Sequence, residues 1–301
     1  MNLLLTGANK YSGEQIRELA RIGFEITFVQ DERIPLKEQG VDPSIIDAVV
    51  CNALFLHNDI DEFTNLKLIQ LTSAGLDRVP LEKIKERGID IYNARGVYSI
   101  PMAEFALCGV LQLYKKSGSF SASQNSKEWK KEREIKELFG KNVCVVGCGS
   151  VGTECAKRFI AFGCNVTGVD IVPRENEFYS EMVSLEVLDK VLGKSDVVVL
   201  TLPLTTDTRN LFDKKMFEKM KKGAVLVNIA RGAIVSESAL INTLKDKLFG
   251  AVLDVFEQEP LSDESPLWSM DNVILTPHNS FVGEGNSERL FNVIYENLKR
   301  K

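Results

Sequence analysis

Short apolar runs alternate with amphipathic stretches along the whole chain. In the first third, five apolar runs predict β-strands, at Leu3–Thr6, Ile26–Val29, Ala48–Cys51, Leu68–Thr72 and Ile89–Tyr92. Stretches such as Gly13–Ile22 and Pro80–Arg87 lie between them and carry the periodicity of helices with one buried face. Strands that alternate with helices predict a parallel sheet covered by helices on both faces.

A second strand–helix series follows a different kind of segment. Pro101–Lys116 predicts a long, mostly apolar helix, and Ser117–Arg133 is polar and Ser-rich, which is typical of an exposed arm or connector. Six further strands are predicted at Val143–Gly147, Val166–Val169, Val197–Leu200, Val225–Ile229, Ala251–Val255 and Val273–Leu275. Six such strands fit a doubly wound nucleotide-binding domain, and a final helix is expected over Gly285–Arg300.

Composition narrows the class of protein. At roughly 100–200 residues per domain, the 301 residues predict two domains. A net charge of −5 offers no basic surface for nucleic acid, and no apolar run approaches the ~20 residues of a membrane span. The N-terminus lacks the basic start of a signal peptide, and six scattered cysteines suit a reducing cytoplasm. With only two histidines, a His-rich metal site is excluded, and we expect no metal.

The strongest local signal is a glycine motif between a strand and a helix. Gly147, Gly149 and Gly152 form Gly-x-Gly-x-x-Gly, in which the glycines permit a tight turn, close approach of a pyrophosphate and close helix–strand packing. The next strand ends in Asp170, the expected position of an acid that hydrogen-bonds the adenosine ribose. This combination predicts NAD as the cofactor. Arg174, four residues later, is a mild signal for NADP.

A second glycine-containing turn, Thr6–Gly13, also follows a strand. It resembles the start of short-chain dehydrogenases, but it lacks the tight glycine spacing, and no later strand ends in an acid at the right distance. We interpret it as an ordinary turn of the first domain.

Candidate catalytic residues follow three successive predicted strands. Arg231 follows Val225–Ile229, Asp254 and Glu259 follow the next strand, and His278 follows Val273–Leu275. Open α/β sheets bind ligands at the carboxyl ends of their strands, so these side chains are expected to meet. Each could have an ordinary structural role alone, whereas their joint placement favours a catalytic one.

The chain resembles the D-isomer-specific 2-hydroxyacid dehydrogenases over nearly its whole length. In the second half the similar stretches are Gly147–Gly152, Leu202–Thr208, Asn228–Gly232, Leu253–Pro260 and Leu275–His278. In the first half they are Leu66–Ile69, Ala74–Asp77, Gly88–Ile91 and Ala103–Glu104. The resemblance implies a flavodoxin-like substrate domain, residues 1–97 plus 282–301, and a Rossmann NAD-binding domain, residues 98–281. It further implies a cleft that can close on the substrate.

The resemblance also implies roles for individual residues. Arg231 would bind the substrate carboxylate and carbonyl oxygens, His278 would be the acid–base, and Glu259 would orient it. The backbone of Ser73, Ala74 and Gly75 would cradle the substrate carboxylate, and Asp254 would contact the nicotinamide end of NAD. Further cofactor contacts are implied for Ser150, Val151, Thr201, Pro203, Thr208, Ile229 and His278.

These roles agree with the charge changes of the reaction. Hydride transfer to a 2-keto carbon builds negative charge on the keto oxygen, where an arginine offers paired donors. A histidinium delivers the proton, and a carboxylate behind the imidazole fixes its tautomer and favours the cation. Arg231, His278 and Glu259 supply these three groups.

Several features leave the substrate and the function open. Many family members carry a His before the Pro-Leu-Thr motif, where this chain has Thr201, and the bulky Phe281 follows His278 where many have a small turn. The alternatives are a formate- or phosphonate-type dehydrogenase and a non-enzymatic, NAD-sensing binding protein like the C-terminal-binding corepressors. From the short segment after His278 we expect no regulatory domain of the kind found in many phosphoglycerate dehydrogenases.

Two other residues are functional candidates. His57 has only Asp59 or Asp61 as possible orienting acids, so a structural or peripheral role is favoured over catalysis. Arg95 lies where the chain crosses between domains and could meet a second anionic group of a substrate, although a solvated hinge arginine is the favoured interpretation.

The segment between the domains also predicts an oligomer. The helix Pro101–Lys116 is apolar on most of its circumference, and a helix of that kind must be buried. The Ser-rich arm with Trp129 could embrace a second copy, as in the twofold dimers of the family. We therefore expect a homodimer.

Overall fold

The computed structural model describes residues 1–300 and divides into two compact units. Unit 1 comprises Met1–Tyr98 and Gly283–Lys301, and unit 2 comprises Ser99–Val282. The chain thus crosses between the units twice, each time one residue beyond the predicted boundary. Within residues 1–300, no helix has both the length and the apolar character needed to cross a membrane.

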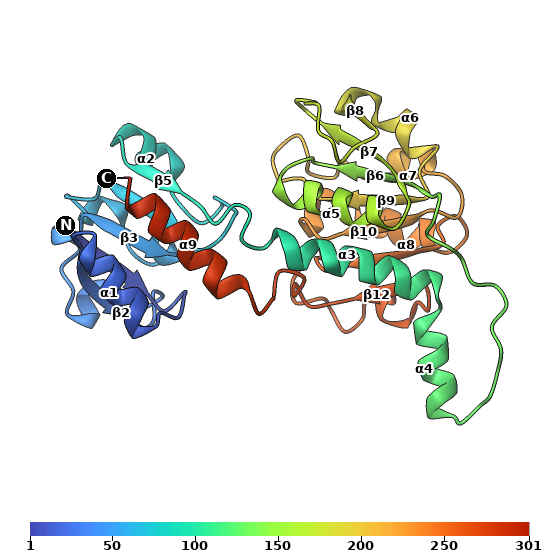
Figure 1. Cartoon of the computed structure of the whole chain (residues 1–301), viewed down its shortest axis with the longest axis horizontal. Coiled ribbons are helices and arrows are strands. Elements are labelled where there is room, and N and C mark those ends of the chain that lie inside the picture. The colour runs from blue at the N-terminus through green and yellow to red at the C-terminus, as the bar shows by residue number, and fades with distance from the viewer. Residues whose placement is uncertain (301) are drawn as a thin grey trace. The chain divides into compact units, whose positions relative to one another are not determined.

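Unit 1 is built on a parallel sheet of five strands in the order β2-β1-β3-β4-β5 (Figure 1). The strands are β1 (Asn2–Thr6), β2 (Glu25–Val29), β3 (Ala48–Cys51), β4 (Leu68–Leu71) and β5 (Asp90–Tyr92). This is the flavodoxin-like order, which confirms the predicted fold of this part. Its α-helices are α1 (Gly13–Arg21), α2 (Leu81–Glu86) and α9 (Asn286–Leu298). Short 3-10 helices lie at Leu36–Gln39, Pro43–Ile45, Leu54–Leu56 and Ile60–Glu62.

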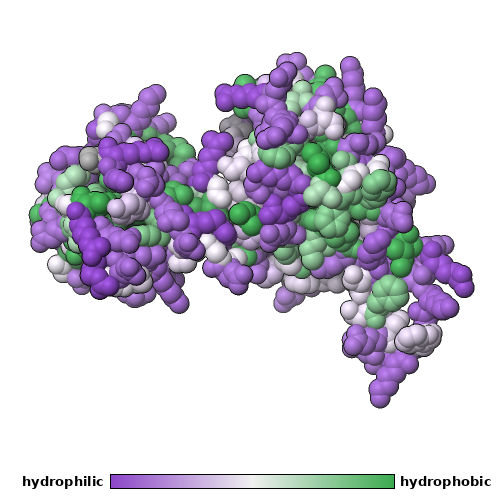
Figure 2. All heavy atoms as spheres, viewed as in Figure 1, coloured by the Kyte–Doolittle hydropathy of each residue, from purple (hydrophilic) through white to green (hydrophobic). Residues whose placement is uncertain are grey.

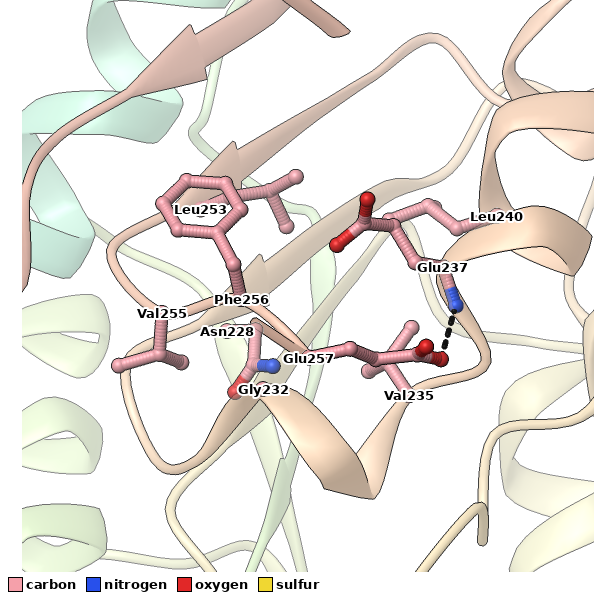
Figure 3. A pocket seen from close by; sticks show the side chains of 9 residues that line it. All are labelled: Asn228, Gly232, Val235, Glu237, Leu240, Leu253, Val255, Phe256 and Glu257. Carbon is pink, nitrogen blue, oxygen red and sulfur yellow. Dashed lines mark hydrogen bonds between the residues drawn. The ribbon is translucent and has the colours of Figure 1, made fainter. Parts of the chain in front are cut away.

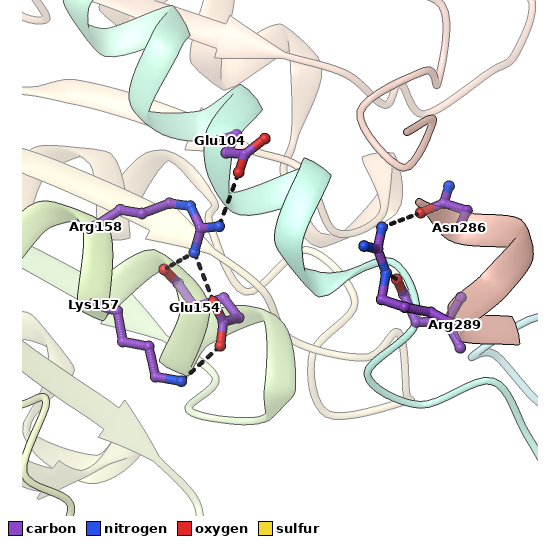
Figure 4. Close-up of polar contacts among 7 residues, drawn as sticks. Glu104, Glu154, Lys157, Arg158, Asn286 and Arg289 are labelled. Atoms are coloured by element: carbon purple, nitrogen blue, oxygen red, sulfur yellow. Dashed lines mark hydrogen bonds and ion pairs between the residues drawn. The ribbon is translucent and has the colours of Figure 1, made fainter. Parts of the chain in front are cut away.

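Helix α9, at the C-terminal end of the chain, packs on unit 1. Leu290, Ile294 and Leu298 recur at i, i+4 and i+8 and are buried in a core that also contains Leu3 and Leu5 of β1. The Arg289 side chain binds the two chain segments next to the crossings: Nε donates to the Val97 carbonyl at 2.9 Å, and Nη2 donates to Asn286 Oδ1 at 2.8 Å (Figure 4). The apolar face and this arginine together fix α9 on unit 1.

Unit 2 is built on a parallel sheet of seven strands in the order β12-β11-β10-β9-β6-β7-β8. Its strands are β6 (Asn142–Val146), β7 (Asn165–Asp170), β8 (Glu181–Ser184), β9 (Val197–Leu200), β10 (Val225–Asn228), β11 (Gly250–Leu253) and β12 (Val273–Leu275). The chain order reverses between β6 and β9, as in the Rossmann fold, which confirms that prediction. The count of six strands was wrong because the edge strand β8 begins and ends with polar residues and lacks a continuous apolar run.

Helices cover both faces of this sheet. One buried cluster includes residues of α6 (Leu188–Leu192), α7 (Lys214–Lys219) and α8 (Glu237–Leu244), and the other includes residues of α3 (Ser99–Tyr114) and α5 (Ser150–Ala161). Short 3-10 helices lie at Leu185–Val187, Gly232–Ile234 and Pro266–Ser269. Figure 4 also shows Arg158 of α5 bridging to Glu104 of α3 at 3.0 Å, an ion pair at the surface of this packing.

The apolar helix α3 is buried mainly inside its own unit. Ala106 and Val110 are fully buried, and a Cβ on Gly109 would lie 2.5 Å from a methyl group of Val252. Its apolar circumference is therefore explained largely by packing within one chain. The polar segment after it was expected to be an exposed arm or connector, and no helix was predicted there. In the structure α4 (Ser117–Asn125) forms in this segment and points away from the rest of unit 2 (Figure 1).

Candidate functional site

The turn after β6 has backbone conformations and contacts that require its glycines. Gly147 has φ +94°, and a Cβ there would lie 2.9 Å from the Leu202 nitrogen. A Cβ on Gly152 would lie 2.1 Å from the Gly147 carbonyl oxygen, so α5 can approach the turn only because this position lacks a side chain. These two glycines therefore serve the tight turn and the close packing that the motif predicts.

Gly149, the second glycine of the motif, leaves space above the start of α5. Gly149 is the N-cap residue of α5, makes no side-chain capping bond, and has no atom within 4 Å of the place a Cβ would take. The helix N-terminus, which attracts anions through its N–H groups and its dipole, thus faces open space. Ser150 and Val151 form the first turn of this helix. The arrangement fits the pyrophosphate of a dinucleotide.

Two polar side chains fix the glycine turn from neighbouring strands. Asp170, at the end of β7, accepts a hydrogen bond from the Cys148 nitrogen at 2.7 Å and one from the Val172 nitrogen at 3.1 Å. The Thr201 hydroxyl, after β9, donates to the Gly147 carbonyl at 2.5 Å. Burial raises the pKa of the Cys148 thiol to about 11, so this thiol is protonated at neutral pH. Asp170 thus lies beside the turn.

The remaining predicted cofactor residues lie on the loops after β9 and β10. The buried Thr208 hydroxyl donates to the Pro203 carbonyl at 2.7 Å and accepts from the Thr205 nitrogen at 2.8 Å, which closes the Leu202–Thr208 loop on itself. Ile229, directly after β10, is almost fully buried. These contacts stabilise the loops from inside, and direct contact with a cofactor stays a prediction.

The candidate catalytic residues follow β10, β11 and β12, which are direct neighbours in the sheet. His278 Nδ1 lies 2.8 Å from Glu259 Oε2, and each side chain is roughly two-fifths exposed to solvent, at 41% and 36%. The Arg231 guanidinium lies on the adjacent loop, where Nη1 donates to the Ala230 carbonyl at 2.7 Å. The structure therefore brings the predicted Glu259–His278 pair together at the edge where α/β sheets bind ligands.

Asp254 is fully buried and holds the loop that carries His278. Its carboxylate accepts hydrogen bonds from the Thr276 hydroxyl at 2.7 Å, the Asn279 nitrogen at 2.7 Å and the Ser280 nitrogen at 2.9 Å. The His278 nitrogen donates to the Asp254 carbonyl at 2.8 Å, and His278 itself has φ +50°, in the left-handed region that non-glycine residues seldom adopt. The predicted contact of Asp254 with the nicotinamide stays a prediction.

Glu259 is held on the side away from His278. Its Oε1 accepts a hydrogen bond from the Phe256 nitrogen at 3.1 Å, while Oε2 pairs with the histidine. The backbone at Phe256 in turn touches Gly232: a Cβ on Gly232 would lie 1.8 Å from the Phe256 oxygen. The Arg231 loop and the Glu259 loop are therefore in direct backbone contact.

Sequence reasoning missed a pair of glutamates beside this contact. Glu257 Oε1 accepts a hydrogen bond from the Glu237 nitrogen at 2.8 Å, next to a small cavity lined by both residues (Figure 3). Burial raises the pKa of the Glu237 carboxyl, a hydrogen bond from the Glu257 backbone partly opposes this rise, and the negative charge of Glu257 adds to it. The two glutamates are 20 residues apart, so no local pattern in the sequence could have revealed their contact.

The other candidates belong to unit 1. Ser73, Ala74 and Gly75 follow β4, and their loop is fixed by the Asn93 amide, which donates to the Ala74 carbonyl at 2.8 Å. His57 is exposed, and Arg95 lines a groove between the β5 region and α9. In the described part of the chain, no group of three or more His, Cys, Asp or Glu residues could hold a metal ion.

Comparison with known proteins identifies the relatives of this chain. The model of the "D-isomer specific 2-hydroxyacid dehydrogenase, NAD binding domain" family matches residues 107–280. A hydroxypyruvate reductase of Thermotoga maritima is 37% identical over 241 residues, 78% of each chain. A D-3-phosphoglycerate dehydrogenase of Methanocaldococcus jannaschii is 35% identical over 80% of this chain but only 46% of its own length. The structure of a D-lactate dehydrogenase of Aquifex aeolicus with NAD and lactic acid is 25% identical, with a TM-score of 0.78 over 99% of this chain and 94% of that one.

Proposed function

Because the chain belongs to the D-isomer specific 2-hydroxyacid dehydrogenase family, and is thus an NAD-dependent oxidoreductase of 2-hydroxy acids, we propose that it interconverts a small 2-keto acid and the D-2-hydroxy acid. The observation that carries the proposal is the Glu259–His278 pair at 2.8 Å, with Arg231 on the loop of the neighbouring strand. Relatives named for hydroxypyruvate, glyoxylate, glycerate and lactate support a small substrate.

His278 is the acid–base of the proposed reaction. In the reducing direction its protonated ring donates a proton to the keto oxygen, and in the oxidising direction the neutral ring accepts one from the hydroxyl. Glu259 accepts the Nδ1 proton, which leaves Nε2 as the atom that exchanges a proton with the substrate. This geometry makes one ring nitrogen responsible for both directions.

Arg231 binds the substrate in this proposal. Its guanidinium offers parallel N–H donors to the carboxylate and to the keto oxygen, where negative charge develops. We further propose that backbone groups of Ser73, Ala74 and Gly75 contribute to binding of the carboxylate. The backbone contact between Gly232 and Phe256 fixes the Arg231 loop against the loop that carries Glu259.

The dinucleotide site is formed by the glycine turn. NADH supplies the hydride when it is bound. The open N-terminus of α5 binds the pyrophosphate, and Asp170 accepts hydrogen bonds from the adenosine ribose. A carboxylate at this position repels a 2′-phosphate, so we propose a preference for NADH over NADPH.

Steady-state turnover of NADH with a panel of small 2-keto acids tests the proposed function. We expect glyoxylate, hydroxypyruvate or pyruvate to support oxidation of NADH, and the product to be the D-hydroxy acid. Turnover of NAD with formate or phosphite, but not with a 2-hydroxy acid, would contradict the substrate class. NAD binding without any turnover would contradict catalysis and leave a sensing role.

A homodimer is proposed as the state in solution. In unit 2 the Ser-rich arm carries Trp129, which is 98% exposed. Phe139, between the arm and β6, is 78% exposed, and Phe162 at the end of α5 is also exposed. Figure 2 shows apolar side chains gathered on one face of this unit and again on the projecting arm. Large exposed aromatic residues are typical of protein interfaces. Sedimentation that shows a monomer at micromolar concentration would contradict the dimer.

A cytoplasmic location is also proposed. All six cysteines are free thiols, and four of them are buried. Buried thiols without disulfides are typical of proteins from reducing compartments. Detection of the native protein in a periplasmic or secreted fraction would contradict this location.

A further inference from the structure

The loop that carries Glu259 touches the Arg231 side of unit 2 at two points. The first is the backbone contact between Gly232 and Phe256, which leaves no room for a Cβ. The second is the hydrogen bond from the Glu237 nitrogen to Glu257 Oε1, at 2.8 Å. Figure 3 shows the Glu257 side chain reaching across to the start of α8, which lies beyond the short helix that follows Arg231.

Glu257 caps the start of α8, where no neighbouring side chain provides a capping hydrogen bond. Ser236, the N-cap residue of α8, makes no side-chain capping bond, and its hydroxyl instead lies 3.3 Å from the Ser238 hydroxyl. The first N–H groups of a helix need acceptors, and a negative charge is favourable there because of the helix dipole. The Glu257 carboxylate supplies both the hydrogen-bond acceptor and the negative charge, although it comes from a loop 20 residues away in the sequence.

The position of Glu257 links this cap to the catalytic pair. Phe256 precedes it and donates its backbone N–H to Glu259 Oε1, and Glu259 Oε2 pairs with His278. The segment 256–259 is thus held at one end by Glu257 on α8 and at the other by His278. Without the Glu257 carboxylate the segment keeps the Gly232 contact, the Phe256 hydrogen bond and the pair with His278, but it loses its side-chain bond to the start of α8.

We propose that Glu257 is a positioning residue for the reaction: by binding the start of α8, it holds Glu259 in the place from which Glu259 orients His278. The inference rests on the proposed function, because it assigns Glu257 a part in the acid–base step. Glu257 touches neither substrate nor cofactor in this account, and it acts through Glu259.

The kinetic test compares three changes. Glu257→Ala should lower kcat about tenfold, since small displacements of catalytic groups are costly, while the dissociation constant of NADH stays within about twofold. Glu257→Gln retains an oxygen acceptor and should keep most of the parent kcat. Glu264→Ala removes an exposed glutamate from the following loop and serves as the matched control, with parent kinetics expected.

A double variant separates positioning from helix stability. Glu257→Ala should lower the melting temperature, because α8 loses its cap. In Glu257→Ala/Ser236→Asp, the aspartate at the N-cap supplies a local acceptor for α8, so the melting temperature should return to that of the parent. We expect kcat to remain low, because the loop is still released from the helix. Recovery of both kcat and melting temperature would overturn the proposal, since Glu257 would then act only as a helix cap.

Histidine NMR provides a readout that does not depend on turnover. The chain has two histidines, so His57→Asn leaves His278 as the single imidazole resonance set. In this background, Glu257→Ala should shift the His278 ring resonances in the same direction as Glu259→Gln, and Glu264→Ala should not. Unchanged His278 resonances together with parent kcat would overturn the proposal. A parent protein that reduces no 2-keto acid would contradict the proposed function separately, since the NMR comparison remains valid.

Discussion

Replacement of Gly232 by alanine tests whether the contact between two loops sets the geometry of the site. Gly232 follows Arg231, and its Cα faces the backbone of the loop that carries Glu259. An added Cβ would lie 1.8 Å from the Phe256 oxygen, 1.9 Å from its carbonyl carbon and 2.6 Å from the Glu257 nitrogen. All three atoms belong to backbone, so no side chain can rotate away. The two loops must separate.

The size of the effect follows from that distance. Carbon makes ordinary contacts at about 3.5 Å, so one loop must move by roughly 1.5 Å relative to the other. A displacement of ~1 Å can cost about 100-fold in rate, because reacting groups lose their alignment. We therefore expect kcat/KM for the 2-keto acid to fall at least about 100-fold, equivalent to ~2.7 kcal/mol of transition-state stabilisation.

The assay compares kcat/KM, the dissociation constant of NADH and the melting temperature in the same preparations. NADH binding should change far less than the rate, because the glycine turn lies between β6 and α5. Gly193→Ala is the matched control in unit 2: a Cβ there would come no closer than 3.7 Å to any atom, and we expect parent activity. A folded, NADH-binding Gly232→Ala protein with kcat/KM within threefold of the parent would refute the reasoning.

Four further predictions concern charge. Glu259→Gln keeps the side-chain shape but removes the negative charge 2.8 Å from His278, so reduction should lose its rate at a lower pH and oxidation should persist to a lower pH; unchanged pH–rate limbs would contradict the pairing. His278→Ala should lower kcat by about 10²–10⁴, and near-parent activity would return His57 as the candidate acid. Asp170→Ala should bring the Kd values of NADH and NADPH closer together, because the carboxylate that repels the 2′-phosphate is removed. A parent enzyme that binds NADPH more tightly than NADH would show that Arg174 dominates. For Glu237, burial raises the pKa in the folded protein, so ionisation costs stability as pH rises from ~4.3 through that raised value. Glu237→Gln should therefore melt at a higher temperature than the parent at pH 7 and show no such advantage below about pH 4; an equal difference at both pH values would contradict the assignment.

Local patterns were sufficient for most of the strands and for the glycine turn. β3 and β9 lie at the predicted residues, because a continuous apolar run that is buried on both faces of a parallel sheet has clear ends in the sequence. The half-buried edge strand β12 also lies at the predicted residues. β8 and α4 were missed for the converse reason. A polar edge strand and a Ser-rich projecting helix bury little apolar surface, so neither has a hydrophobic period that identifies it.

The sequence by itself determined the fold class, the dinucleotide turn and the identity of the residues that follow β10, β11 and β12. Their proximity was predictable in outline, because parallel strands end at one edge of a sheet. Only the tertiary structure decided which atoms pair: Asp254 turns inward to bind the His278 loop, Gly232 meets the Phe256 backbone, and Glu257 caps α8. Such contacts join residues about 20 or more positions apart, and their geometry depends on how neighbouring loops pack. Spacing along the chain carries no information about that packing.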